Sequence, residues 1–598
     1  MAEILKRSQI PVADTWAIED MFASDAAWEE SFAGLDEGIK ELSAFAGKLG
    51  QSGQMLYDYL KTMEQLDEKC GILGNYAMRR SDVDTRDATY QAMTGKFMSK
   101  YIAIGAACSF ETPEIMAISD EQLETFYREC PELERYRRYL TDMRRRKEHV
   151  LSEAEEKLLA AAGEMSQTPD NVYGAFADAD LTFADAVDSQ GNKHPVTQGT
   201  FVPLQDSSDR MLRKSAYESL YGGFSAFRNT AAGLLDAQNK QLKFFAEARK
   251  YPNAFEAALD SNNVPTDVYL NLIEAVHKNL DKMHRYVRLR KKLLGVDELH
   301  FYDIYTSLVK DVDKKISFQQ AKETVYDALA PMGEEYRKIL KEGFENRWID
   351  PYQNEGKRSG AYSAGCSVHP YVLMNYNDTL DNQFTLAHEM GHALHSYLSN
   401  KTQNPIDRQY VIFVAEVAST CNEALLMEYL LKNTTDKKER AYLINHFLEQ
   451  FKGTLYRQTM FAEFELNIGK MVSQGQTLTA DNLSQEYRRL NALYFGEDMV
   501  VDDQIAMEWA RIPHFYYNYY VFQYATGYAA AIALSRRILN EGESAVKDYI
   551  EFLSGGCTKS PIDLLKGAGV DMTTSEPVEK ALELFGELLD EMEELMAE

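Results

Sequence analysis

No apolar run in the sequence is long enough to cross a membrane. A spanning helix needs about 18 apolar residues, and no stretch of the chain approaches that length. The first residues, MAEILKRSQIPVADTW, also lack the continuous apolar core and the small-residue cleavage site of a secretory signal. These absences predict a cytoplasmic protein that does not bind a membrane.

Basic residues are outnumbered by acidic ones. The chain has 64 Lys and Arg against 93 Asp and Glu, which gives a formal net charge of −29. Nucleic acids and anionic membranes attract proteins through clustered Lys and Arg, so this balance argues against both as partners. The basic run from Arg144 to Lys147 is interpreted as an exposed helical face.

Cysteine pairs and flexible linkers are also missing. The six cysteines are widely scattered and form no CxxC motif, so we expect free thiols in a reducing compartment. The chain has no linker rich in Pro, Gly or Ser and no repeat of fixed period. We therefore expect one compact body with sublobes.

Helical periodicity, in contrast, is abundant. Apolar residues recur at spacings of three and four, which is typical of amphipathic helices. The segments with this pattern are 154–165, 268–293, 321–340 and 439–471. The sequence predicts a mainly α fold, with a helical N-terminal region at 1–205 and a catalytic region at 206–598.

Strand signals are few. Segments 181–187 and 199–204 flank the turn-like DSQGN and predict a β-hairpin. The run YVLMNY at 371–376 predicts one more short strand, ahead of the segment that carries the strongest motif.

That motif lies in residues 386–398, LAHEMGHALHSYL, which contain the pattern H-E-x-x-H on a predicted helix. His388 and His392 are one turn apart on the same face, so both imidazoles can reach one ion at about 2.1 Å. Glu389 lies on the adjacent flank, where it can activate a metal-bound water. A chance occurrence of the pattern remains an alternative at this point.

A downstream helix supplies candidate acids. Segment 411–431 is strongly apolar but contains Glu416 and Glu423. A buried carboxylate needs a cation or strong hydrogen-bond donors, so we predict Glu416 as the third metal ligand. The alternative is that Glu416 lies at a helix end and faces solvent or an Arg. Glu423 lies about 10.5 Å further along, too far to share the ion. It either hydrogen bonds to a ligand histidine or forms an ordinary salt bridge.

His395 lies on the same helical face as His388, but two turns away. All three histidines therefore cannot bind one metal ion. We interpret His395 as a histidine that packs behind the ligands.

Three motifs occur in the order expected of a known family. They are GKRSGAYSAG-(x5)-YVLMNY, HEMGHALH and FVAEVAS, and with them the chain resembles oligoendopeptidase F of the thimet oligopeptidase superfamily. The resemblance extends over most of the chain, with a looser match at 181–259. It implies a mainly helical, two-lobed body around a deep channel that admits short peptides, and a small β-sheet near the active site.

The resemblance also assigns the metal site. It implies one Zn²⁺ ion held by His388, His392 and Glu416, with Glu389 as the general base. The ligand geometry alone leaves the identity of the metal open, because manganese or cobalt can also bind such donors.

Further residues are implied to contact the substrate. In the late segment PHFYYNYYVFQYATGY, the resemblance points to His514, Tyr520 and Tyr524 as groups that hold the reacting carbonyl. The other tyrosines of this run leave the register open, and part of the run is expected to be aromatic core. Gly360, Ala361 and Tyr362 match a Gly-rich turn near the substrate, and YVLMNY is expected to be an edge strand that pairs with the peptide.

The predicted function is a zinc endopeptidase that hydrolyses internal bonds of short oligopeptides. A zinc aminopeptidase is one alternative, but the chain lacks the Gly-x-Met-Glu-Asn element expected to grip a free amino terminus. A non-catalytic helical peptide-binding protein is the other, and the intact Glu389 argues against it. The sequence does not predict an oligomeric state.

Overall fold

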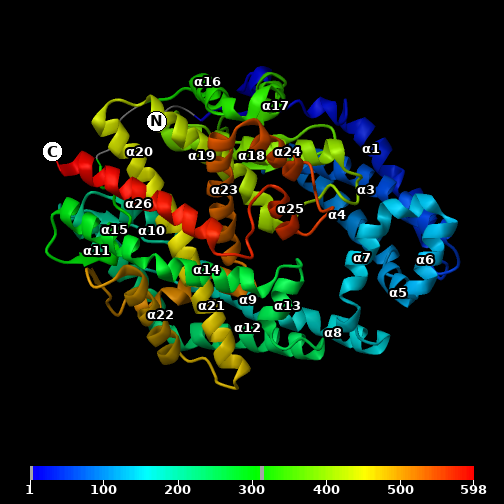
Figure 1. The fold of residues 1–598 in the computed structure, drawn as a ribbon, viewed down its shortest axis with the longest axis horizontal. Helices are drawn as coiled ribbons and strands as arrows, with labels where there is room; N and C mark the ends of the chain where they lie inside the picture. The colour runs from blue at the N-terminus through cyan, green and yellow to red at the C-terminus, as the bar shows by residue number, and fades with distance from the viewer. Residues whose placement is uncertain (1–3, 310–314, 598) are drawn as a thin grey trace. The chain divides into compact units, whose positions relative to one another are not determined.

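Helices with buried apolar faces make up most of the chain, and the strands are short. The computed structural model describes residues 4–309 and 315–597, and Figure 1 shows its elements. The predicted mainly α fold is confirmed. Contacts group the residues into two units, and each unit is built from three separate stretches of the chain.

The first unit comprises the stretches 1–148, 314–429 and 534–569. It contains a three-stranded sheet and the parts of α18 and α19 that carry the predicted metal ligands. Its helices are α1 (Asp25–Ala33), α2 (Leu35–Ser43), α3 (Gly53–Asp82), α4 (Ala88–Ala107), α5 (Glu111–Ala117), α6 (Asp120–Glu129), α7 (Arg137–Arg145), α16 (Phe318–Ala328), α17 (Gly333–Glu345), α18 (Leu380–Thr402), α19 (Ile412–Asn433), whose last residues pass into the other unit, α24 (Glu543–Leu553) and α25 (Pro561–Gly567).

The second unit comprises the stretches 149–313, 430–533 and 570–598. It contains two small strand pairs, β1 (Ala186–Val187) with β2 (Lys193–His194) and β3 (Leu299–His300) with β7 (Met499–Val500). Its helices are α8 (Glu153–Ser166), α9 (Thr168–Gly174), α10 (Gln198–Asp206), α11 (Arg210–Ala226), α12 (Arg228–Ala248), α13 (Ala254–Asp260), α14 (Thr266–Lys278), α15 (Leu280–Leu294), α20 (Lys437–Gln450), α21 (Arg457–Ser473), α22 (Ala480–Phe495), α23 (Phe522–Glu541), which ends in the first unit, and α26 (Glu576–Ala597).

The sheet of the first unit corrects one prediction. Its strand order is β4 (Ile349–Asp350), β6 (Tyr371–Leu373), β5 (Tyr362–Ala364), so the YVLMNY segment supplies the central strand and not an edge. All three residues of β6 are fully buried, as expected for an uninterrupted apolar run with neighbours on both sides. The two edge strands are β4, which is parallel to β6, and β5, which is antiparallel to it.

The predicted turn of the β-hairpin is present, but the predicted second strand is not a strand. Strands β1 and β2 flank the predicted turn, but residues 199–204 belong to helix α10. The Thr197 side chain accepts a hydrogen bond from the Thr200 N–H at 3.0 Å and caps this helix. A capping side chain of this kind starts a helix where the apolar pattern alone suggested a strand.

The predicted helices form, with breaks that the periodicity did not show. Segment 154–165 lies in α8, whereas 268–293 divides into α14 and α15 at Asn279. Segment 321–340 divides into α16 and α17 around Pro331, which cannot continue a helix. Within the described ranges, no helix combines enough length and apolarity to cross a bilayer.

Candidate metal centre

Helix α18 presents the two histidines of the motif on one face. Its N-terminus is capped by Thr379, whose side chain accepts a hydrogen bond from the Asn382 N–H. The ring centroids of His388 and His392 are 4.8 Å apart. Buried apolar residues on the opposite side anchor the helix, and α16, α17, α24 and strands β5 and β6 pack against it.

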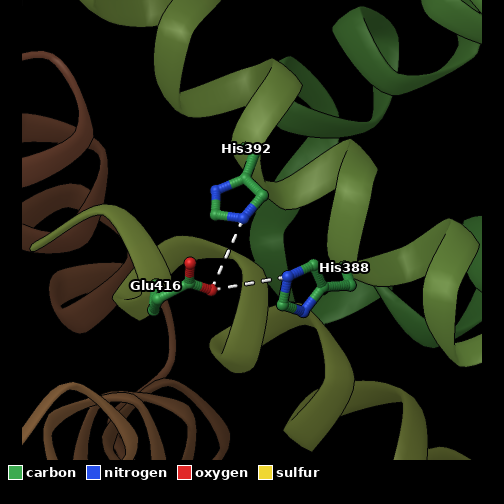
Figure 2. Close-up of side chains that lie close together, drawn as sticks. All are labelled: His388, His392 and Glu416. Atoms are coloured by element: carbon green, nitrogen blue, oxygen red, sulfur yellow. Dashed lines mark ion pairs between the residues drawn. The ribbon is translucent and has the colours of Figure 1, made fainter. Parts of the chain in front are cut away.

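Helix α19 brings Glu416 to the same point. Its Oε2 lies 3.4 Å from His388 Nε2 and 3.5 Å from His392 Nε2 (Figure 2). The three donor atoms are all within 4.8 Å of one another. Two imidazole nitrogens and one carboxylate oxygen are a donor set that catalytic zinc sites use, so these residues fit the predicted ion.

The surrounding carboxylates favour positive charge at this point. Burial raises the pKa of Glu416, but the histidines outweigh burial and lower that pKa to about 2. Burial lowers the pKa of His388, but Glu423 above all outweighs burial and raises it to about 9. The Oε2 of Glu423 is 3.5 Å from His388 Nδ1, so the two nitrogens of this ring face two different carboxylates.

Glu389 is buried close to the predicted ligands without being one of them. Glu389 is 6% exposed, and its Oε2 has no hydrogen-bond partner among the described residues. Burial raises the pKa of Glu389, although His388 and His392 lower it in part. A buried carboxylate with an unused oxygen and increased basicity is suited to accept a proton.

Gly391 permits the close crossing of α18 and α19. A Cβ atom at this position would lie 2.6 Å from the Ser419 Cα and 2.7 Å from the Ala418 carbonyl oxygen. The Ser419 hydroxyl in turn donates a hydrogen bond to Glu416 Oε2 at 3.2 Å. Sequence reasoning missed both residues, although a glycine in the middle of a helix is a signal of close packing.

His395 lies away from the predicted ligands, as its spacing indicated. It is 1% exposed, and its ring stacks on Tyr410 at a centroid distance of 3.6 Å. Burial lowers the pKa of His395 to about 3, so this ring is neutral. The Tyr410 hydroxyl is within hydrogen-bond distance of Ser396, and the stack therefore fixes the segment that leads into α19.

The predicted substrate turn enters the edge strand β5. Gly360 has φ of 81°, and its carbonyl oxygen accepts a hydrogen bond from the Asn375 side chain at 2.8 Å. Tyr362 is the first residue of β5, and its hydroxyl donates to Asp82 at 2.5 Å. Ala361 lies between them. The hydroxyl of Tyr362 is therefore engaged within the protein.

The late aromatic segment lies in the second unit. The ring centroid of Tyr524 is 6.0 Å from His514 and 5.3 Å from Tyr520, so the structure brings these three predicted side chains together. Tyr516 and Tyr519 are buried, as expected for core residues of the run, whereas Tyr517 is 48% exposed. Burial lowers the pKa of His514, which favours a neutral ring.

Comparisons with known proteins identify the family of the chain. A model of peptidase family M3 matches residues 203–584, and one of oligopeptidase F matches residues 114–183. Oligopeptidase PepF of Bacillus subtilis (strain 168) is 48% identical over 99% of this chain and 88% of its own.

Two solved structures extend the comparison to the fold. A putative peptidase from Chlamydophila abortus has a TM-score of 0.93 and 36% identity, with 99% of this chain and 100% of that chain covered. An oligoendopeptidase-F from Enterococcus faecium has a TM-score of 0.75 and 37% identity, with coverage of 96% and 99%.

Proposed function

Because the chain belongs to the oligopeptidase F group of peptidase family M3, a metallopeptidase family, we propose that it is a zinc-dependent endopeptidase acting on short oligopeptides. The main support for this proposal is that the donor atoms of His388, His392 and Glu416 lie close together, and that the next residue after His388 is the buried Glu389. A site kept only to bind metal needs the three ligands but not the adjacent base.

The ligands would hold one Zn²⁺ ion and leave a coordination position open. When bound, the ion supplies Lewis acidity, which lowers the pKa of water toward neutrality and polarises a carbonyl oxygen. Glu423 would accept a hydrogen bond from the Nδ1–H of His388 and so keep the Nε2 lone pair directed at the metal position. The carboxylate of Glu416 supplies the negative charge that offsets the ion.

Glu389 performs the proton transfers of the proposed reaction. Its carboxylate takes a proton from the attacking water and then passes it to the nitrogen of the leaving amine. His514, Tyr520 and Tyr524 carry polar groups that would donate hydrogen bonds to the oxygen of the reacting carbonyl. Such donors stabilise negative charge that develops only in the transition state.

The edge strand β5 is the proposed docking element for the peptide. Gly360, Ala361 and Tyr362 lead into it, and a peptide that pairs with an edge strand is held through its main chain. Recognition of this type reads few side chains, so we expect many sequences to be accepted. The Tyr362 hydroxyl is engaged with Asp82, so this residue would contact substrate through its backbone or ring.

We further propose that the protein works in the cytoplasm without nucleic acid or membrane as a partner. The six cysteines are free, which agrees with a reducing compartment. The acidic surface charge disfavours polyanions.

The test uses a short, internally quenched peptide blocked at both ends. Wild type should cut internal bonds, lose activity to a chelator and regain it with zinc. Glu389→Ala should lower kcat by roughly 100-fold or more because it removes the general base, while zinc content is unchanged. Lys401→Ala, at an exposed position of the same helix, is the control and should behave like wild type.

Equal turnover by wild type and Glu389→Ala would contradict the proposed mechanism. Zinc binding without turnover of any peptide would favour the peptide-binding alternative. Activity restricted to peptides with a free amino terminus would favour an aminopeptidase.

A further inference from the structure

A buried carboxyl group contacts the backbone of the late aromatic segment, residues 513–528. Glu465, on helix α21, is 3% exposed. Its Oε1 accepts a hydrogen bond from the backbone N–H of Tyr519 at 2.6 Å. Its Oε2 is buried and has no hydrogen-bond partner among the described residues. Among the described residues no cation lowers its pKa, so this glutamate has no salt-bridge partner there.

The backbone that Glu465 contacts has an unfavourable conformation. Asn518 and Tyr519 both have positive φ, 58° and 55°. For a residue other than glycine, the left-handed region costs on the order of 1–2 kcal/mol, because Cβ approaches the following carbonyl oxygen. Two such residues in succession persist only where the surroundings hold them.

The side chain of Tyr519 is held by the same helix. A Cβ at Gly469, one turn after Glu465, would overlap the Tyr519 hydroxyl, so the absence of a side chain there makes room for this ring. The ring also packs against Phe255 and Tyr269, at centroid distances of 5.4 and 6.2 Å. Glu465 and Gly469 therefore fix the backbone and the ring of Tyr519 respectively.

This turn connects the two segments that carry the proposed substrate-binding rings. His514 lies before it in a short 3-10 helix (Pro513–Tyr516). Tyr520 follows it directly and precedes α23, and Tyr524 lies in the first turn of α23. The conformation of the turn consequently sets the position of His514 relative to both tyrosines. The ring centroids of His514 and Tyr520 are 6.3 Å apart.

We propose that Glu465 is a positioning residue, which as a neutral carboxylic acid locks the Asn518–Tyr519 turn and so holds His514, Tyr520 and Tyr524 in their catalytic arrangement. This inference rests on the function proposed above for those three side chains. Burial raises the pKa of Glu465 to about 8, only partly offset by the Tyr519 hydrogen bond, which agrees with a neutral acid at physiological pH.

The test compares two substitutions of similar size. Glu465→Gln keeps a carbonyl oxygen that can accept from the Tyr519 N–H and has no charge, whereas Glu465→Met removes the acceptor. With the blocked peptide, Glu465→Gln should have about the wild-type kcat, and Glu465→Met should lose roughly 10- to 100-fold in kcat through misplaced groups. Zinc content should be unchanged, and Lys470→Ala, at an exposed position of the same helix, should resemble wild type.

Amide hydrogen exchange over residues 517–521 tests the lock without the reaction. Protection should be kept in Glu465→Gln and reduced in Glu465→Met. If Glu465→Met alters thermal stability but neither exchange nor kcat, the role is only structural and the inference is wrong. A loss in Glu465→Gln as large as that in Glu465→Met would also overturn it.

Failure of the proposed function gives a different result. In that case wild type has no turnover that depends on Glu389, whatever the residue at position 465. Such a result would overturn the catalytic part of the inference, while the exchange data would still decide whether Glu465 locks the turn.

Discussion

At the scale of single residues, the surroundings of three glutamates give them different charges. The histidines keep Glu416 ionised, with a pKa of about 2. Burial raises the pKa of Glu389 despite the same histidines. Glu465, without a cation, has a pKa of about 8. The same side chain therefore serves as predicted ligand, proposed base and proposed neutral lock because of its neighbours alone.

The raised pKa of Glu465 predicts a pH dependence of stability. Its usual pKa is 4.5, so between pH 4.5 and about 8 the unfolded chain loses this proton and the folded protein keeps it. The contribution of Glu465 to the free energy of unfolding is therefore full below pH 4.5 and falls as pH rises to about 8, at up to about 1.4 kcal/mol per pH unit. Above that pH it is constant.

Urea unfolding of wild type and Glu465→Gln across this pH range measures the effect. The variant lacks the titrating proton, so the wild-type value minus that of the variant should fall between pH 4.5 and 8. A difference independent of pH would show that Glu465 is already ionised in the folded protein.

Local patterns in the sequence were enough to predict which side chains lie close together, although their roles as ligands stay a prediction. The spacing within HEMGH placed both histidines on one face, and an acid in an apolar helix indicated Glu416. The role of Glu423 stayed open because helical spacing does not reveal a partner on another helix. The bond from Tyr362 to Asp82 joins residues 280 positions apart, which no local pattern shows.

At the scale of elements, Gly391 controls how closely α19 can approach α18. Gly391→Ala should push the α19 backbone away from the helix with the histidines and displace Glu416. We expect weaker zinc binding and a lower melting temperature, because the clash involves backbone atoms that cannot rotate aside. Zinc affinity and thermal unfolding measure both effects.

Gly95 provides the matched control for this substitution. It also lies inside a helix, α4, but a Cβ there would meet no atom within 4 Å. Gly95→Ala should therefore leave zinc binding unchanged and stabilise by up to about 1 kcal/mol through helix propensity. Equal zinc affinity in the Gly391 and Gly95 variants would contradict the close-approach explanation.

Element-scale errors arose where long-range contacts decide the structure. The central position of β6 depends on pairing with β4 and β5, and on a hydrogen bond from the Trp16 indole to the Val372 carbonyl oxygen. Periodicity within YVLMNY cannot distinguish a central strand from an edge strand. At α10, by contrast, the sequence itself contained the signal for a helix, because Thr197 can cap a helix N-terminus. This cap outweighed the strand-like apolar pattern.

At the scale of the whole molecule, the division of the chain at about residue 205 stays a prediction about sequence regions. Both contact units combine early and late stretches of the chain. In the first unit, the N-terminal stretch contacts the sheet beside α18: Arg7 pairs with Asp350, and the Tyr371 hydroxyl donates to the Ala17 carbonyl oxygen.

A fragment of residues 206–598 should therefore lose the metal centre. It contains every predicted ligand but lacks the N-terminal partners of the sheet, including Trp16 and helix α3. We expect no cooperative unfolding transition for the first unit, no stoichiometric zinc and no turnover. A fragment that binds zinc and cleaves peptides like the full chain would show that residues 206–598 form an independent catalytic domain.

The interleaved first unit also has a consequence for biosynthesis. Helix α24, which packs against α18, begins only at Glu543 and is therefore translated long after the segment that carries Trp16. The nascent chain must therefore keep the apolar surfaces of this earlier segment from aggregating until α24 has been translated. On the function proposed above, we expect metal binding to follow the translation of α24, so that a chain released before that point has no catalytic activity.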